Sequence, residues 1–272
     1  MIVFNRETGK VGATLTGHSK RVNAVAFAPK HPHVLVSGGH DKTTKVWRAS
    51  AGSGAESVQL SEFKLAATMK DHAGEVTAVC AHPTSQYFVT ASADKTWAFY
   101  DLEAALCLTQ VTDSSMAGGY TCAAFHPDGL ILGTGTTENL VRIWDVKSQD
   151  NVAKFEGHTA AVTGLSFSEN GYHLATCAAD GVKLWDLRKV KVFKTLTPYD
   201  GAPTAAVKFD TSGLYLGVGG VDARVYGVKQ DWEVVATYTD IKKAATALAW
   251  TPDAKELLVC SMDRNLRTYG TK

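Results

Sequence analysis

A unit that occurs twice in nearly complete form limits what this chain can fold into. One copy, residues 157–188, reads GHTAAVTGLSFSENGYHLATCAADGVKLWDLR, and the other, residues 17–48, reads GHSKRVNAVAFAPKHPHVLVSGGHDKTTKVWR. Both begin with Gly-His, have a Trp near the end and contain two short runs of alternating apolar and polar residues. Alternation with a period of two predicts half-buried strands. The unit therefore predicts short antiparallel strands joined by tight turns.

Four side chains hold the same places in both copies. His158 precedes the innermost predicted strand, and Thr176 lies on the second strand. Asp180 occupies the next turn, where Asp180-Gly181 favours a two-residue hairpin, and Trp185 lies on the third strand. The imidazole can bond the carboxylate and the hydroxyl, while the hydroxyl accepts from the indole, so every polar group has a partner when buried. The predicted structural tetrads are His158, Thr176, Asp180 and Trp185, and His18, Ser37, Asp41 and Trp47.

The third-strand aromatic recurs along the whole chain, at spacings between 41 and 53 residues. A period in the low forties with Gly-His and Trp-Asp signatures is typical of WD repeats, each of which builds one propeller blade. The longest spacing contains residues 49–63, rich in Ser, Gly, Ala and Glu, which we predict to be a loop. The fold class is therefore all-β, a WD-repeat β-propeller forming a single domain over residues 1–272. The aromatic positions are Trp47, Tyr100, Trp144, Trp185, Tyr226 and Tyr269.

The residues before the first Gly-His resemble the end of a repeat. Residues 2–4 resemble a third strand and residues 11–16 an outer strand, so the chain holds six repeats plus a partial one. Residues 11–16 could supply the outer strand that the last repeat lacks, which would close six blades without an exposed sheet edge. We favour a seven-bladed parent ring with an incomplete first blade, since it gives residues 2–4 a place. The six sets of strands should start near Val22, Val76, Thr121, Val162, Thr204 and Ala245.

The tetrads superficially resemble a hydrolase triad. However, the hydroxyl lies on a strand with an indole partner, and no Gly-x-Ser-x-Gly elbow or oxyanion loop accompanies it. The weaker copies also lose members: the second has Tyr100 for Trp, and the third has Glu138 for Asp and no His. The fifth and sixth keep Asp222 and Asp263 without a His. Redundant structural staples can decay in this way, whereas a catalytic set cannot, so we predict no catalytic residues.

Composition and spacing disfavour several classes of ligand. Lys plus Arg number 28 against 27 Asp plus Glu, so no overall field attracts nucleic acid or anionic lipid, and no stretch is apolar enough to span a bilayer. Cys80 with His82 and Cys122 with His126 lie in different repeats without a second Cys pair, which disfavours zinc. We predict no metal, no cofactor and no direct nucleic-acid or membrane contact. The five scattered cysteines are expected to be reduced thiols of the core.

Protein recognition on the surface remains. Tyr172 follows Asn170-Gly171 in a predicted hairpin turn where a polar residue would suffice, so it is a candidate partner contact, although it could pack on its own blade. The residues before the turn acids are mostly small or apolar, which disfavours a ring of arginines that reads a phosphorylated degron. These residues are His40, Ala93, Thr137, Ala179, Val221 and Met262.

Three segments carry a more specific resemblance. They are TWAFYDL at residues 96–102, HPDGLILGTGT at 126–136, and residues 157–196 with SENGY and VKLWDLRK. These are not general WD-repeat features, and the likeness extends over nearly the whole chain. The chain resembles the WD-repeat domain of the pre-mRNA-processing factor nineteen family, the U-box E3 ubiquitin ligases of the spliceosomal nineteen complex. The family's U-box and coiled coil have no counterpart in this sequence.

The resemblance implies a seven-bladed propeller, a nuclear location and a non-catalytic domain that docks protein partners or substrates from splicing and DNA repair. It also implies that this chain alone is no enzyme and that tetramers form only through the coiled coil missing here. Tyr172 lies within a matching segment, which strengthens it as a partner contact. The alternative is a stand-alone WD-repeat scaffold unrelated to ubiquitin transfer.

Overall fold

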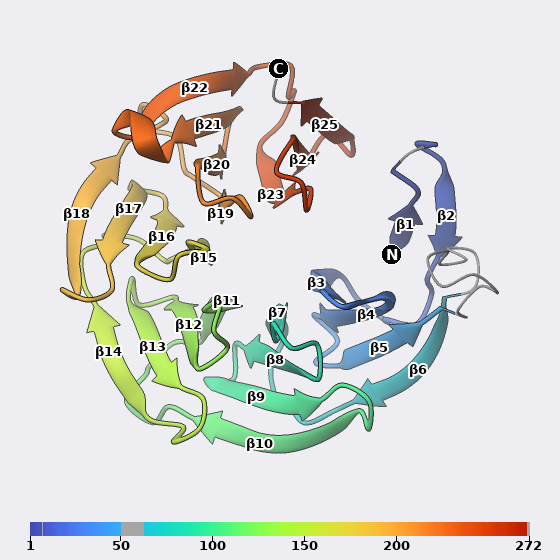
Figure 1. Ribbon diagram of the computed structural model, residues 1–272. Helices are drawn as coiled ribbons and strands as arrows, with labels where there is room; N and C mark the ends of the chain where they lie inside the picture. The colour runs from blue at the N-terminus through green and yellow to red at the C-terminus, as the bar shows by residue number, and fades with distance from the viewer. Residues whose placement is uncertain (7, 50–62, 271–272) are drawn as a thin grey trace. The chain divides into compact units, whose positions relative to one another are not determined.

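A computed structural model describes residues 1–6, 8–49 and 63–270. The chain divides into two compact units, Met1–Ala123 and Ala124–Lys272, with the boundary inside strand β11 (Tyr120–Phe125). Almost all regular structure in the described residues is β-strand, and one short 3-10 helix, Val228–Gln230, follows β21 (Ala223–Gly227). Figure 1 shows that, within each unit, the strands of one sheet lie side by side in chain order.

The first unit contains a two-stranded and two four-stranded sheets. The small sheet pairs β1 (Ile2–Phe4) with β2 (Val11–Thr14). The next consists of β3 (Val22–Ala28), β4 (His31–Gly39), β5 (Thr44–Arg48) and β6 (Lys64–Met69). The following sheet consists of β7 (Val76–Ala81), β8 (Tyr87–Ser92), β9 (Thr96–Asp101) and β10 (Leu106–Thr112).

The second unit continues this pattern. Strand β11 leads into β12 (Ile131–Thr136), β13 (Val141–Asp145) and β14 (Asn151–Phe155). The fourth repeat forms β15 (Gly164–Phe167), β16 (His173–Ala178), β17 (Gly181–Asp186) and β18 (Lys191–Leu196). The fifth forms β19 (Ala206–Phe209), β20 (Tyr215–Gly219), β21 (Ala223–Gly227) and β22 (Glu233–Tyr238). The sixth forms β23 (Ala245–Trp250), β24 (Glu256–Ser261) and β25 (Leu266–Gly270).

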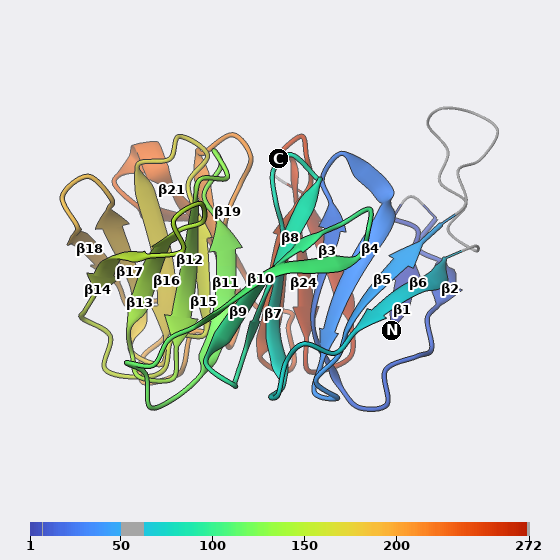
Figure 2. The same cartoon turned by 90° about the horizontal axis from the view of Figure 1, so that it is seen from below.

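Each larger sheet is an antiparallel meander, so its turns gather at two opposite edges (Figure 2). The pairing of the third with the outer strand shifts register just before the recurring aromatic, as between Leu184 and Trp185. The outer strand then carries one extra residue, a β-bulge that re-aims neighbouring side chains. Four of these extra residues have apolar side chains that the bulge turns toward the solvent. They are Leu108, Val152, Phe193 and Val235.

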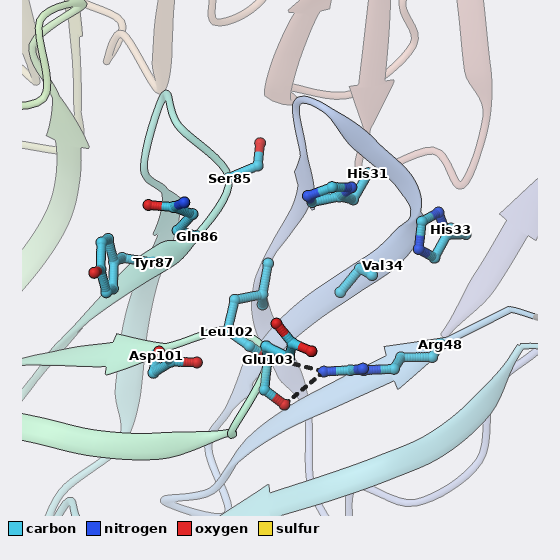
Figure 3. A pocket seen from close by; sticks show the side chains of 10 residues that line it. All are labelled: His31, His33, Val34, Arg48, Ser85, Gln86, Tyr87, Asp101, Leu102 and Glu103. Carbon is cyan, nitrogen blue, oxygen red and sulfur yellow. Dashed lines mark hydrogen bonds between the residues drawn. The ribbon is translucent and has the colours of Figure 1, made fainter.

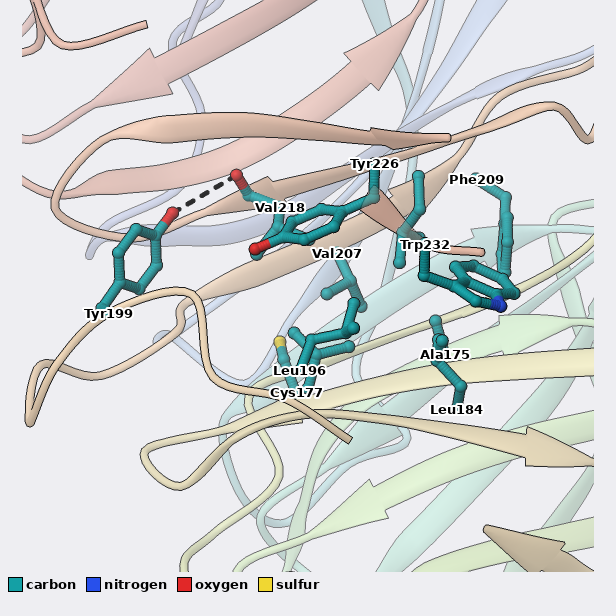
Figure 4. Packing of buried hydrophobic residues seen from close by; sticks show 12 residues of the cluster. Ala175, Cys177, Leu184, Leu196, Tyr199, Val207, Phe209, Val218, Tyr226 and Trp232 are labelled. Atoms are coloured by element: carbon teal, nitrogen blue, oxygen red, sulfur yellow. Dashed lines mark hydrogen bonds between the residues drawn. The ribbon is translucent and has the colours of Figure 1, made fainter. Parts of the chain in front are cut away.

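Apolar side chains fill the space between neighbouring sheets of one unit. Figure 4 shows the cluster between the fourth and fifth repeats, where Leu184 and Ala175 face Val207 and Phe209. Trp232, from the turn before β22, contacts the ring of Phe209 at a centroid distance of 6.1 Å. Middle strands bury consecutive residues, as β16 does from Leu174 to Ala178, because the sheet is covered on both faces there. Outer strands such as β10 only alternate partly buried and exposed residues.

Six sheets of three or four strands confirm the all-β WD-repeat prediction of six repeats, and the β1–β2 pair is the partial one. This number fits the six-bladed alternative. The first strands of the six repeats begin within two residues of the predicted starts. Of the predicted loop at residues 49–63, only Ala49 and Phe63 are described, both buried, and residues 50–62 lie outside the described residues. The single-domain extent stays a prediction.

Candidate functional site

The structure brings His158, Thr176, Asp180 and Trp185 together inside the fourth sheet. The His158 Nδ1 lies 2.6 Å from Asp180 Oδ1, and its Nε2 lies 2.7 Å from Thr176 Oγ1. Trp185 Nε1 donates to the same hydroxyl at 2.8 Å. With a neutral imidazole, Nδ1–H donates to the carboxylate and Nε2 accepts the hydroxyl proton. Both ring nitrogens are therefore occupied, and neither is left to exchange a proton with a substrate.

The electrostatics of this tetrad favour the neutral imidazole. Burial lowers the pKa of His158 and outweighs the opposing hydrogen bond with Asp180. Burial would raise the pKa of Asp180, but hydrogen bonds from His158 and the Thr159 amide keep it below its ordinary value. The carboxylate stays ionised and the ring stays uncharged near neutral pH.

The turn that carries Asp180 differs from the prediction. Ala178 pairs with Gly181, so the two-residue connection is formed by residues 179–180, and the predicted turn at Asp180-Gly181 is wrong by one residue. Gly181 is instead the first residue of β17, at a φ of +108° that favours glycine. This placement lets Asp180 reach back to His158 and to the Thr159 amide.

The first sheet brings its four predicted residues together in the same way. His18 Nδ1 lies 2.9 Å from Asp41 Oδ1, and His18 Nε2 lies 2.8 Å from Ser37 Oγ. Trp47 Nε1 donates to Ser37 Oγ at 2.8 Å. Burial would raise the pKa of Asp41, but hydrogen bonds from His18, Thr43 and the Ser19 amide hold it well below its usual range.

The second sheet keeps the histidine but changes the indole. His72 Nδ1 lies 3.2 Å from Asp94 Oδ2, and its Nε2 lies 2.6 Å from Thr90 Oγ1. Tyr100, in the place of the indole, donates its hydroxyl to Asp71 Oδ2 at 3.1 Å. The set of contacts therefore adapts to the tyrosine while the His, Thr and Asp of the tetrad remain.

Sequence reasoning missed the residues that hold the turn acid where the histidine is absent. In the fifth repeat, Arg224 Nε lies 3.0 Å from Asp222 Oδ1, and its guanidinium lies 5.0 Å from the centre of the Tyr199 ring. Tyr199 donates to the backbone carbonyl of Asp222 at 2.8 Å. In the sixth repeat, Arg267 Nη2 lies 2.7 Å from Asp263 Oδ2. The sequence signal that could have identified these residues is an arginine two or four positions after the turn acid.

Tyr172 lies on the turn between β15 and β16 and is 51% exposed. The guanidinium of Arg188 lies 4.7 Å from the centre of its ring, a distance at which a cation attracts an aromatic face. Arg188 is held in turn by Asp186, with Nη2 3.0 Å from Oδ2. One face of the ring thus packs on its own repeat, while half of the side chain remains open to solvent.

The turn beneath Tyr172 is fixed by its neighbours. The Tyr172 amide donates to Asn170 Oδ1 at 3.0 Å, and His126 Nε2 donates to the Gly171 carbonyl at 3.0 Å. Gly171 has a φ of +73°, and a Cβ there would lie 2.6 Å from the His126 ring. The equivalent position in the third repeat is Leu130, which is 65% exposed. The second unit therefore presents a rigid exposed aromatic and a separate exposed leucine at matching turns.

A recess of about 450 Å³ lies in the first unit, between the β3–β4 turn and the ends of β8 and β9 (Figure 3). Arg48 Nη2 donates to the carbonyls of Leu102 and Glu103 at 3.0 and 2.8 Å. The side chains of His31, Asp101 and Glu103 also line it. Side chains of both charges therefore line this recess.

Three structural features concern ligands that the sequence disfavours: metal ions, nucleic acid and lipid bilayers. Within residues 1–6, 8–49 and 63–270, no three His, Cys, Asp or Glu side chains gather in a way that could hold a metal ion. Four basic residues follow Trp185, namely Arg188, Lys189, Lys191 and Lys194, and the charge of Lys194 is offset because its Nζ lies 2.9 Å from Asp231 Oδ1. No helix in the described part of the chain could cross a bilayer. All five cysteines lie in strands: Cys177 is buried, Cys80, Cys107 and Cys122 are partly buried, and Cys260 is exposed. The prediction of core thiols therefore holds fully only for Cys177 and is wrong for Cys260.

Comparison with known proteins agrees with this geometry. The pattern of the WD domain, G-beta repeat, matches residues 9–48, 63–101, 108–145, 149–186 and 232–269. The fifth sheet, with its arginine in place of the histidine, lies mostly outside these matches.

Relatives with the name Pre-mRNA-processing factor 19 match 99% of this chain. The protein of Oryza sativa subsp. japonica is 53% identical over 275 residues, which are 50% of its own length. The protein of Homo sapiens is 40% identical over 271 residues, 51% of its length. Homolog 2 of Arabidopsis thaliana is 50% identical over 274 residues, also 50% of its length. The chain thus spans about half the length of the curated relatives it matches.

Proposed function

The chain belongs to the WD domain, G-beta repeat family, and on that premise we propose that it is a non-catalytic docking domain that recruits protein partners in pre-mRNA splicing. The names of its relatives support the splicing role. We further propose, from the resemblance of residues 96–102, 126–136 and 157–196, that it serves a U-box E3 ubiquitin ligase with a part in the DNA-damage response. A nuclear location, and contact with proteins but not directly with nucleic acid or membrane, belong to the same proposal.

The exposed ring of Tyr172 is the observation that carries the docking role. Binding energy concentrates on a few aromatic and arginine side chains that are already ordered before the partner arrives. Arg188 lies against one face of this ring, and the His126 bond to Gly171 fixes the turn. Little conformational entropy would therefore be lost when a partner covers the open half of Tyr172.

The tetrads support a non-catalytic role. The His158 side chain is 1% exposed, and both of its nitrogens already have partners within the sheet. A general base must reach the proton it removes, which this ring cannot do without breaking the tetrad. We propose that the four residues of each tetrad serve as structural staples.

Affinity capture from nuclear extract tests the docking role. The whole chain should retain splicing proteins, and Tyr172→Ala should reduce their recovery at least tenfold, since an aromatic hot spot is worth about 2 kcal/mol or more. Val152→Ala is the matched control, because Val152 is 57% exposed on the outer strand of the same unit. Melting temperatures of both variants should stay at the wild-type value. Capture of no splicing protein by the folded wild type would refute the role, and equal recovery by the two variants would refute the assignment of Tyr172.

A ubiquitination assay tests the division of labour with a ligase. The chain, incubated with ubiquitin and its activating and conjugating enzymes, should form no conjugates, because the proposal assigns ubiquitin transfer to the U-box of the family and only docking to the WD repeats. Formation of conjugates by this chain alone would overturn the non-catalytic assignment.

A further inference from the structure

A different recess of the first unit gathers three lysines beside the first turn acid. It has a volume of about 450 Å³ and lies at the edge of the sheet that carries Asp41, opposite the edge with the β3–β4 turn. Lys42 follows Asp41 in the turn, Lys45 lies in β5, and Lys70 follows the last residue of β6. Thr68 and Ser19 contribute hydroxyl groups to the lining.

Lys45 is the unusual member of this group. Its side chain belongs to a residue that is only 6% exposed, and its Nζ donates to the neutral hydroxyl of Thr68 at 2.9 Å. Among the residues that the structure describes, no ion pair involves Lys42, Lys45 or Lys70. Burying an ammonium without a counter-charge is costly, so an anion in the recess would be stabilised there.

The carboxylate of Asp41 does not supply that counter-charge. Its two oxygens already accept from His18 Nδ1 at 2.9 Å, the Ser19 amide at 2.8 Å and the Thr43 hydroxyl at 2.8 Å. Three lysine ammonium groups and this one carboxylate leave the lining with two positive charges in excess.

The fourth sheet provides an internal comparison. Lys183 occupies the same register as Lys45, since Lys183 pairs with Thr195 where Lys45 pairs with Thr68. However, Lys183 Nζ lies 3.9 Å from Asp180 Oδ2 and so has a carboxylate near it. The excess of positive charge is thus a property of the first sheet and not a general feature of the repeat.

We propose that Lys42, Lys45 and Lys70 bind the phosphate of a phosphoserine or phosphothreonine side chain on a partner protein. A phosphate monoester carries a charge of about −1.5 to −2 at neutral pH, which matches the excess in the recess. A nucleic-acid diester carries one charge per phosphate and is bound along an extended basic track. The chain has a net charge of only +1, and the lysines form one local recess. The site lies in the other unit from Tyr172 and does not depend on the docking role proposed there.

Titration of the whole chain with N-acetyl-phosphoserine amide, followed by amide NMR shifts, tests the site. The amides of Thr43, Lys45 and Thr68 should shift and saturate, whereas N-acetyl-serine amide should leave them in place. The double variant Lys42→Gln with Lys70→Gln should weaken binding at least tenfold, because both lysines are exposed and their loss removes two charges. Lys183→Gln is the matched control and should change the dissociation constant less than twofold.

Folding and the rival ligand are controlled in the same experiment. The double variant should retain the wild-type melting temperature, and since Lys45→Met could unfold the sheet, the test does not require it. Added salt should weaken binding of the phosphoserine amide by screening. Binding that survives the double substitution would overturn the proposal. Tighter binding of a single-stranded RNA 12-mer, with shifts at the same amides, would also overturn it and reassign the recess to nucleic acid.

Discussion

Replacing His158 by alanine should destabilise the chain by an amount that the tetrad geometry sets. The ring makes one bond to a carboxylate, at 2.6 Å, and one to the hydroxyl of Thr176, at 2.7 Å. After the change, Thr176 keeps the indole of Trp185, and Asp180 keeps the Thr159 amide. The variant therefore loses two hydrogen bonds whose remaining partners keep other contacts, and it leaves a cavity in the place of the ring.

The magnitude follows from these contacts. A hydrogen bond with a charged group contributes about 1.5–3 kcal/mol and a neutral one about 0.5–1.5 kcal/mol. Because the Asp180 side chain is 17% exposed and retains other partners, the upper end is not reached, and we expect about 2–4 kcal/mol. For a chain of this length, a loss of that size lowers the melting temperature by roughly 5–15 °C. Trp185→Ala should cost a similar amount, because it opens a cavity beside Thr176.

Thermal and urea denaturation measure this loss, and His126→Ala serves as the matched control. His126 Nε2 donates to the Gly171 carbonyl at 3.0 Å, and its Nδ1 lies 2.7 Å from a carboxylate oxygen of Asp128, whose side chain is 46% exposed. That variant should lose about 1 kcal/mol or less. Equal losses for His158→Ala and His126→Ala would refute the reasoning that assigns the tetrads a staple role.

Two further predictions concern protons and glycines. Because burial lowers the pKa of His158 from 6.5, the unfolded chain binds the proton first, and the free energy of unfolding should fall as pH drops below 6.5. Urea titrations from about pH 7 to about pH 5 measure how steeply the free energy of unfolding depends on pH. This dependence should be weaker in His158→Gln, and an unchanged dependence would contradict the role of His158. Gly220→Ala should lower the melting temperature, since its Cβ would lie 2.1 Å from the Tyr199 ring. Gly270→Ala should leave the melting temperature unchanged, because no atom of the described residues lies within 4 Å of its Cβ, and equal shifts for the two variants would count against the argument.

The repeating parts of the fold could be read from the sequence because they depend on local pattern. The alternation of apolar and polar residues and the spacing of the aromatic residues predicted the strands. The residue types of the tetrad predicted the hydrogen bonds among the four side chains. His18 with Asp41 and His158 with Asp180 are 23 and 22 residues apart, yet the repeat topology brings each pair together. The same pattern predicted the turn one residue too late, at Asp180-Gly181 instead of residues 179–180. The observed turn places the Asp180 carboxylate within hydrogen-bond distance of His158.

The departures from the repeat could not be predicted, since they depend on contacts between residues with no common pattern. Arg224 and Tyr199 replace the histidine in the fifth repeat, but neither type marks a WD repeat. Lys45 and Lys183 occupy one register and look equivalent in sequence. Only distances show that Lys183 Nζ lies 3.9 Å from a carboxylate oxygen, whereas Lys45 Nζ donates to the Thr68 hydroxyl.

The two ways of holding the turn acid give the sheets unequal resistance to local opening. The His158 and Asp180 pair and the Arg267 and Asp263 pair are both largely shielded from water, but Arg267 is also held by Asp240, whose side chain is 62% exposed. Dissolved ions screen exposed pairs far more than shielded ones. At high ionic strength, amide protons of β24 and β25 should therefore exchange with solvent before those of β16 and β17, so that the chain frays from its last repeat inward.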